Sequence, residues 1–221
     1  MTTHQDPLAR EDAEPQPGRG SALRLAAVLM ALGCAMALWA VQHVAVQTGR
    51  GQRLDDRLLA GIRSLTGSTM QQQAATLGQA SFTIAVIVAL ALGLSALVQV
   101  RPERLVVLAV TVGGANVATQ VLKHVLIERP VLTDSAPNSL PSGHMTMVFS
   151  VVLALVLLNE GLLRGLVLVL GVAWVIAMAG VVVVAAWHRP SDVLAAVLVC
   201  LCFAATAVAV VGPGDRSHAW A

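Results

Sequence analysis

Long apolar runs alternate with short polar breaks along the chain, and this alternation restricts the possible fold more than any other feature. The runs cover about residues 22–46, 81–100, 105–126, 143–158, 165–187 and 191–211. Each is near the ~20 residues that a helix needs to cross the hydrocarbon core of a bilayer, although 143–158 is short. The pattern predicts an all-α polytopic membrane protein, a bundle of six transmembrane helices without a repeat or a second domain.

Composition supports a membrane protein and disfavours several other classes. Hydrophobic residues make up 57% of the chain and charged residues 12%, whereas a soluble domain is nearer half apolar and a quarter charged. The net charge of +2 and the lack of a Lys/Arg-rich tract disfavour a nucleic-acid partner. Cys34, Cys200 and Cys202 all lie inside apolar runs, which indicates packing residues rather than a disulfide framework or a metal site.

The polar segments predict what surrounds the bundle. Residues 1–21 are rich in Pro, Gly, Asp and Glu and predict a disordered tail, while 213–221 form a second, short tail around a single domain at 22–212. The first apolar run is longer than a signal-peptide core, so we expect a retained span. Apolar side chains within 48–80 recur at helical spacing, at Leu54, Leu58, Leu59 and Ile62. This segment is either a short amphipathic helix on the membrane surface or a solvated connector.

Chemically versatile residues gather where apolar runs meet. One group lies between Lys123 and His144, and a second, His188-Arg-Pro-Ser-Asp192, joins the last two runs. With six spans, both groups fall on the same side of the membrane. Ionisable groups at such depth are costly and are therefore functional candidates.

The first group contains the parts of an anion site. Ser142 fits the cap of a helix whose first-turn amides and dipole favour an anion, and Gly143 allows close approach of a ligand. Lys123 and Arg129 add two cations, and a guanidinium suits a bidentate grip on phosphate oxygens. Each has an ordinary alternative, since a helix cap and interfacial side chains that reach toward headgroups are common.

The second group contains a candidate nucleophile. His188 and Asp192 are four residues apart, so both side chains can share one helix face. A carboxylate bonded to one ring nitrogen fixes the tautomer and leaves the other nitrogen able to attack. The alternative is a capping Asp beside an interfacial His. No His, Asp, Glu or Cys set in the chain has convincing metal-ligand spacing.

Together these residues resemble a known family. Lys123 with Arg129-Pro130, then Pro141-Ser-Gly-His144, then His188-x-x-x-Asp192 look like the three-part signature of the type-2 phosphatidic acid phosphatase superfamily. That group includes membrane lipid phosphatases, bacterial acid phosphatases and vanadium-dependent haloperoxidases. The resemblance covers about residues 50–210, and the motif order with six spans matches the membrane branch.

The resemblance implies a role for each motif residue. His188 would be the nucleophile that forms a phosphohistidine, Asp192 would orient it, and His144 would protonate the leaving oxygen. The phosphoryl group would be held, without a metal or another cofactor, by Lys123, Arg129, Ser142 and Gly143.

Two positions depart from the family pattern. The first motif usually has six residues between lysine and arginine, and this chain has five, a difference that a loop can absorb. The third motif usually begins Ser-Arg, but Val181 and Val182 occupy those positions. A cation that would grip phosphate is therefore missing there, and Arg189 in the neighbouring turn is a candidate substitute.

These observations lead to one favoured function and three alternatives. We expect an integral-membrane phosphatase that hydrolyses a polyprenyl pyrophosphate, phosphatidylglycerol phosphate or phosphatidic acid. Its other partners would be the surrounding membrane lipids. The first alternative is a catalytically impaired protein that binds a lipid phosphate or acts as a scaffold. A transporter is disfavoured because the ionisable residues gather at one membrane face rather than at the midplane. A haloperoxidase is disfavoured because those family members are soluble.

Cations give a weak indication of orientation. Seven lie on the side of the two termini and seven on the other side, but the latter include Lys123, Arg129 and Arg189 of the candidate site. Without these three, the bias favours cytoplasmic termini. We therefore expect a bacterial inner-membrane protein with cytoplasmic tails and a site that faces outside.

Overall fold

Helices are the only regular secondary structure in residues 17–133 and 138–212, which are the residues that the computed structural model describes. In chain order they are α1 (Pro17–Val41), η1 (Gln42–Val46), α2 (Gly49–Leu65), α3 (Ser68–Val98), α4 (Pro102–Leu108), η2 (Ala109–Gly114), α5 (Ala115–Val121), η3 (Leu122–Leu126), α6 (Gly143–Leu158), α7 (Gly161–Val184) and α8 (Pro190–Val211). The three η segments are π-helical, and α4 through η3 form one continuous helix, Pro102–Leu126. The predicted all-α class is confirmed for these residues.

Five of the described helices are long and apolar enough to cross a membrane, namely Gly20–Val46, Ser68–Val98, Pro102–Leu126, Gly161–Val184 and Pro190–Val211. They support a membrane protein. The sixth predicted span corresponds to α6, which has 16 residues. At 1.5 Å per residue α6 is about 24 Å long, less than the ~30 Å hydrocarbon core of a bilayer. The count of six spans therefore stays a prediction.

Helix boundaries differ from the predicted spans where polar residues continue a helix. α3 begins at Ser68 rather than near residue 81, because its first turns carry Gln and Ala, which favour a helix but are not strongly apolar. α1 begins at Pro17, inside the predicted tail. The rest of that tail and residues 213–221 lie outside the described residues.

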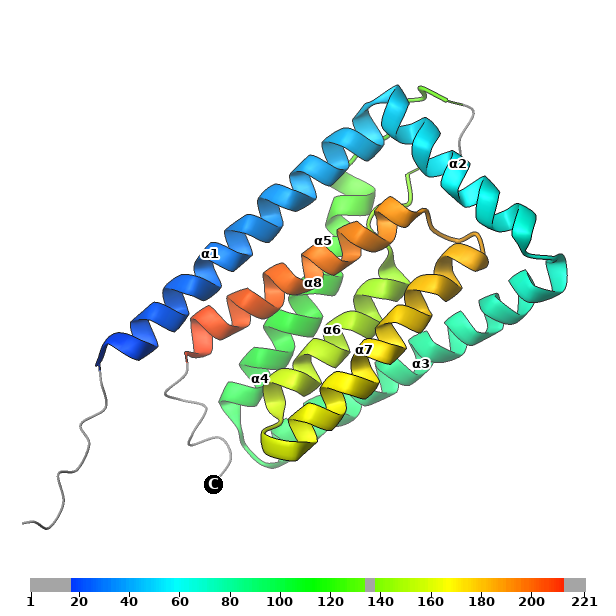
Figure 1. Cartoon of the computed structure of the whole chain (residues 1–221). Coiled ribbons are helices and arrows are strands. Elements are labelled where there is room, and N and C mark those ends of the chain that lie inside the picture. Colours follow the sequence, from blue (N-terminus) through cyan, green and yellow to red (C-terminus); the bar gives the residue numbers. More distant parts are fainter. Residues whose placement is uncertain (1–16, 134–137, 213–221) are drawn as a thin grey trace, which may run out of the picture.

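α2 shows that the first part of the 48–80 segment is helical, and the choice between a helix on the membrane surface and a solvated connector stays open. This helix begins after Thr48, whose side chain accepts a hydrogen bond from the Gly51 amide at 3.0 Å. Figure 1 shows α2 crossing the end of the bundle, between the last turns of α1 and the first turns of α3. A position on the membrane surface stays a prediction.

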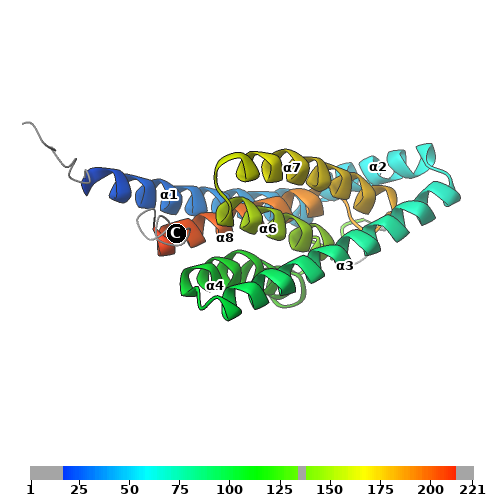
Figure 2. The same cartoon turned by 90° about the horizontal axis from the view of Figure 1, so that it is seen from below.

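The bundle is built around α6. Figure 2 shows α6 between α7 on one side and α3 and α4 on the other, and α8 also packs against it. Its residues Met145, Val148 and Val151 are at most 1% exposed and form the centre of the largest core cluster. α7 approaches closely at Gly171, where an added Cβ would lie 2.5 Å from the Val152 side chain. The short helix α6 is thus packed among the longer helices α3, α7 and α8.

The turn from α7 into α8 is tightly bonded. The Trp187 amide donates to the Val182 carbonyl at 3.1 Å and the Ala186 amide to that of Val183 at 2.9 Å. This is the Schellman pattern of a helix end, with Ala186 in the left-handed region (φ +58°) that glycine usually fills. The turn places His188 just before the first turn of α8.

Candidate functional site

The candidate residues meet at the end of the bundle that α2 crosses, where η3 ends and α6 and α8 begin (Figure 1). A cavity of about 460 Å³ opens there. Its lining comes from η3, α3, α5, α6 and the turn before α8, and comprises Phe82, Asn116, Gln120, Lys123, Gly143, His144, Met147 and His188. Four residues predicted from the sequence are therefore neighbours around one cavity.

His188 and Asp192 form a buried pair. His188 Nδ1 lies 3.3 Å from Asp192 Oδ2, and the same oxygen accepts hydrogen bonds from the Arg189 amide, at 2.9 Å, and from the Ser139 hydroxyl. Both side chains are less than 10% exposed. A donor at Nδ1 fixes the tautomer in which Nε2 carries a lone pair, and His188 also lines the cavity. The arrangement can therefore present a nucleophilic nitrogen to a bound ligand.

The start of α6 is joined to the same pair. The Ser142 hydroxyl caps α6 by accepting from the Met145 amide at 3.3 Å, and the Ser142 amide donates to the Asp192 carbonyl at 3.0 Å. The amides of Gly143 and His144 belong to the first turn, where a helix offers no internal acceptor. Because Gly143 and His144 also line the cavity, this helix end can hold an anion there.

His144 shares the cavity with His188. The centroids of the two rings are 6.4 Å apart, and the His144 ring is also in contact with Phe82 and Trp187, at 5.0 and 4.8 Å between centroids. These aromatic neighbours restrict the imidazole, while Nε2 lies 3.5 Å from Gln79 Oε1. Two histidines on one cavity can act on opposite sides of the same phosphoryl group.

The three candidate cations are not equivalent. Lys123 lines the cavity, whereas Arg129 and Arg189 are absent from its lining. The Arg129 side chain is 4% exposed and ends 4.0 Å from Asp56 Oδ1, the oxygen that also accepts from Arg189 Nε at 3.0 Å. Within the described residues neither terminal nitrogen of Arg129 has a hydrogen-bond partner. Burial lowers the pKa of Arg129, and the Arg189 charge lowers it further.

Sequence reasoning missed the carboxylates of α2. Asp56 accepts from Arg189 and from the Thr133 hydroxyl, and Asp55 accepts from the amide and the hydroxyl of Ser191. Burial raises the pKa of the Asp55 carboxyl, and the hydrogen bonds from Ser191 lower it in part. We call these contacts between α2 and the start of α8 the carboxylate clasp.

One signal in the sequence could have identified the clasp. Asp55 and Asp56 are the only acidic residues in a helix with four arginines. The buried residues of α2 are Gln52 and Asp55, whereas Leu54 and Leu58 are 59% and 48% exposed. The inward side of α2 therefore carries polar side chains near its start, whereas Leu59 and Ile62 further along pack against the core cluster.

Ser139 was also missed. Its hydroxyl donates to Asp192 and accepts from Arg189 Nη1 at 3.1 Å, so it links the loop before α6 to both residues. Arg189 is thereby directed at Ser139 and Asp56. Val182 stands at the position of the family's arginine and is fully buried in the core cluster. Its carbonyl accepts hydrogen bonds from the amides of Trp187 and His188.

Within residues 17–133 and 138–212, no group of three or more His, Cys, Asp or Glu side chains comes together to hold a metal ion. The residues in and beside the cavity supply histidine, carboxylate, cationic and helix-amide groups.

Comparison with known proteins agrees with the motifs. The PAP2 superfamily, which is the superfamily that the sequence motifs resemble, matches residues 26–214, a range that includes every candidate site residue. No curated protein and no solved structure matches the chain. The match covers most of the chain, and the chain belongs to the PAP2 superfamily.

Proposed function

We propose that this protein hydrolyses a lipid phosphate or pyrophosphate through a phosphohistidine on His188. Members of the PAP2 superfamily are phosphatases, and the long apolar helices support a membrane location, so membership supports a membrane phosphatase that acts on phosphate esters. The observation that carries the finer proposal is the His188–Asp192 pair, which faces a cavity that also contains Lys123 and His144.

The reaction would proceed in two displacements. His188 Nε2 attacks phosphorus, and the bond from phosphorus to the lipid oxygen breaks as His144 gives that oxygen a proton. Water then attacks the phosphohistidine, with His144 now taking the proton, and releases phosphate and the free histidine. Lys123 and the amides of Gly143 and His144 would stabilise the charge on the phosphoryl oxygens, and Ser142 would hold that helix end in place.

The two arginines would act differently from each other. We propose Arg129 as a second phosphate ligand, because its terminal nitrogens lack hydrogen-bond partners among the described residues and suit phosphate oxygens. Arg189 is already directed at Asp56 and Ser139. We therefore propose that it supports the loop before α6 and does not grip phosphate.

A second candidate function is a lipid-phosphate binding or scaffold protein. The observation that favours it is the apolar packing of Val182, which leaves the cavity without the family's third-motif arginine. Such a protein would bind the same ligands through Lys123 and the start of α6 but would not release phosphate.

Measurement of phosphate release from a lipid panel separates the two candidates. Purified protein would be given phosphatidic acid, phosphatidylglycerol phosphate and a polyprenyl pyrophosphate, with His188→Ala as the inactive control. We expect release from at least one lipid, and an unchanged rate in EDTA. Binding of the lipids without release by wild-type protein would favour the scaffold. Loss of activity in chelator, restored by one divalent ion, would overturn the metal-free reaction.

We further propose a bacterial inner-membrane location with the site outside the cell. Val131, in the loop before α6, is 92% exposed, and Leu162, near the first turn of α7, is exposed to the same extent. In protein without native cysteines, an impermeant maleimide should label Val131→Cys on intact cells, and Leu162→Cys only after permeabilisation. The opposite result would reverse the orientation.

A further inference from the structure

The cavity at the candidate site has one polar wall. Asn116, Gln120 and Lys123 line it from the single helix Pro102–Leu126, whereas Phe82 and Met147 line it from α3 and α6. The charge of Lys123 is explained by a phosphate ligand. The two amides are not, because a phosphate already has a cation, helix amides and a histidine around it.

The side-chain amide of Gln120 is available to bind a ligand in the cavity. Gln120 is exposed in the cavity lining, and its side chain makes no hydrogen bond with any described residue. Its side chain reaches the start of α6, since a Cβ added to Gly143 would lie 3.4 Å from Gln120 Nε2. An amide donor therefore stands beside the helix end that would hold the phosphoryl group.

Asn116 extends this wall toward the middle of the helix. Its Nδ2 donates to the Val112 carbonyl at 2.8 Å and to the Ser150 hydroxyl at 3.2 Å, so the side chain is held in place. At 1.5 Å per residue, Asn116 lies about 6 Å from Gln120 along the helix axis. The polar wall therefore continues from the phosphate position toward the place of the lipid chains.

We propose that Gln120, with Asn116 behind it, is a specificity-determining residue that recognises the ester-linked glycerol backbone next to the phosphate of an acylglycerol phosphate. This inference rests on the proposed function. In an acylglycerol phosphate, ester carbonyls that accept hydrogen bonds follow the phosphate within a few bonds. In a polyprenyl monophosphate or in an ether-linked lipid phosphate, no ester carbonyl follows and the amide of Gln120 would stay unpaired, whereas the second phosphate of a polyprenyl pyrophosphate would supply acceptors of its own. A site with unpaired polar groups discriminates against the ligand that fails to satisfy them.

Paired lipids and a matched variant test the recognition directly. Diacylglycerol phosphate and its dialkyl ether analogue differ only in the ester carbonyls. Their dissociation constants would be measured in detergent with His188→Ala protein, so that turnover does not interfere, and then with Gln120→Leu added. Val117→Leu is the control, because Val117 lies on the same helix, is 64% exposed and does not line the cavity. The rates of phosphate release by the His188-containing proteins would be compared in parallel.

We expect the ester lipid to bind about tenfold more tightly than the ether, the effect of one hydrogen bond. Gln120→Leu should abolish this preference and weaken binding of a polyprenyl phosphate little, while Val117→Leu keeps the preference. An equal affinity for ester and ether, a preference that survives Gln120→Leu, or no binding of either lipid would overturn the inference. If the preference is found but no lipid is hydrolysed, the recognition stands and the proposed hydrolysis fails. If lipids are hydrolysed without the preference, the hydrolysis stands and the recognition fails.

Discussion

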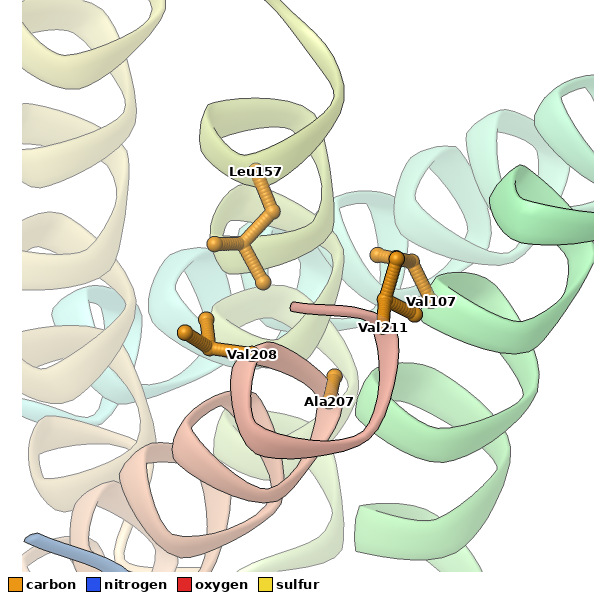
Figure 3. Close-up of a pocket in the computed structure, with 5 residues that line it drawn as sticks. All are labelled: Val107, Leu157, Ala207, Val208 and Val211. Atoms are coloured by element: carbon orange, nitrogen blue, oxygen red, sulfur yellow. The ribbon is translucent and has the colours of Figure 1, made fainter. Parts of the chain in front are cut away.

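The two ends of the helical bundle are built on opposite principles. At one end, His188, Arg189, Asp192 and Asp55 are buried beside a cavity of about 460 Å³. At the other end, α4, α6 and α8 converge on a pocket with room for about 10 Å³, whose lining among the described residues is Val107, Leu157, Ala207, Val208 and Val211 (Figure 3). One end holds polar groups around an open space, and the other is closed by small apolar side chains.

The difference indicates where the fold accepts a cost in stability. Burial of a charged group is costly unless partners replace its water, so a bundle held together only by packing would resemble the apolar end throughout. At the polar end, Asp192 Oδ2 accepts three donors and the arginines converge on Asp56. The polar end is arranged to hold charge, and the apolar end to hold the helices together.

The largest effect is expected from removal of the nucleophile. His188→Ala should abolish turnover and any acid-labile phosphoenzyme, because it removes the proposed attacking nitrogen. Asp192→Asn should be damaging but milder, since it changes the charge and orientation of the imidazole and leaves the attacking nitrogen. Both are checked by phosphate release and by trapping of labelled enzyme in a quench at neutral or alkaline pH. Equal, small losses in both variants would mean that the polar end is structural.

A smaller and substrate-dependent effect is expected at His144. Loss of general acid help in His144→Ala should slow a poor leaving group by about 10²–10⁴-fold. An aryl phosphate, whose leaving oxygen needs the proton less, should recover a larger share of the wild-type rate in this variant than in His188→Ala. The measurement is kcat for a lipid and for an aryl phosphate in both variants. The same fractional loss for both substrates would contradict a role in proton donation.

Loss of a contact in the carboxylate clasp should lower the rate less than loss of either histidine, because the clasp acts only by positioning Arg189. Asp56→Asn removes the charge that holds Arg189 and should lower kcat by about tenfold, the scale of one charge-assisted hydrogen bond. The KM should change little, because Asp56 does not line the cavity. Rates measured over a range of substrate concentrations give kcat and KM separately. Arg53→Gln, on the exposed face of α2, is the control. A rise in KM with unchanged kcat would instead place Asp56 in ligand binding.

The smallest effect on rate is expected at the apolar end. Val107→Ala removes two methyl groups from the buried lining of this pocket and enlarges it. The free energy of unfolding should fall by about 1–2 kcal/mol. The rate at a temperature well below the transition should remain that of the wild-type protein. Thermal unfolding in detergent and phosphate release check both parts. A loss of activity without a loss of stability would show that the two ends are coupled.

The sequence predicted the helical class, the family and four of the residues that line the cavity, because each rests on a local pattern. Apolar runs indicate helices, and the cap at Ser142 and the four-residue spacing of His188 and Asp192 depend on a few adjacent residues. The contacts of Asp55 and Asp56 with α8 could not be predicted in the same way. They join residues more than 130 positions apart in the chain. They also require that Gln52 and Asp55 of α2 face inward, which hydrophobic periodicity alone does not decide.

For the proposed phosphatase, the shortness of α6 would determine the order of events for a lipid substrate. α6 has 16 residues, whereas α3 has 31 and α7 has 24. Figure 1 shows α1 and α3 continuing past the start of α6 to meet α2, so the missing length falls at Gly143 and His144. When the longer helices cross a bilayer, a phosphate must descend past neighbouring headgroups and lose hydration before any bond breaks. Acyl chains that remain in hydrocarbon can offset this loss, so sugar phosphates and other esters without an apolar part should be excluded at entry.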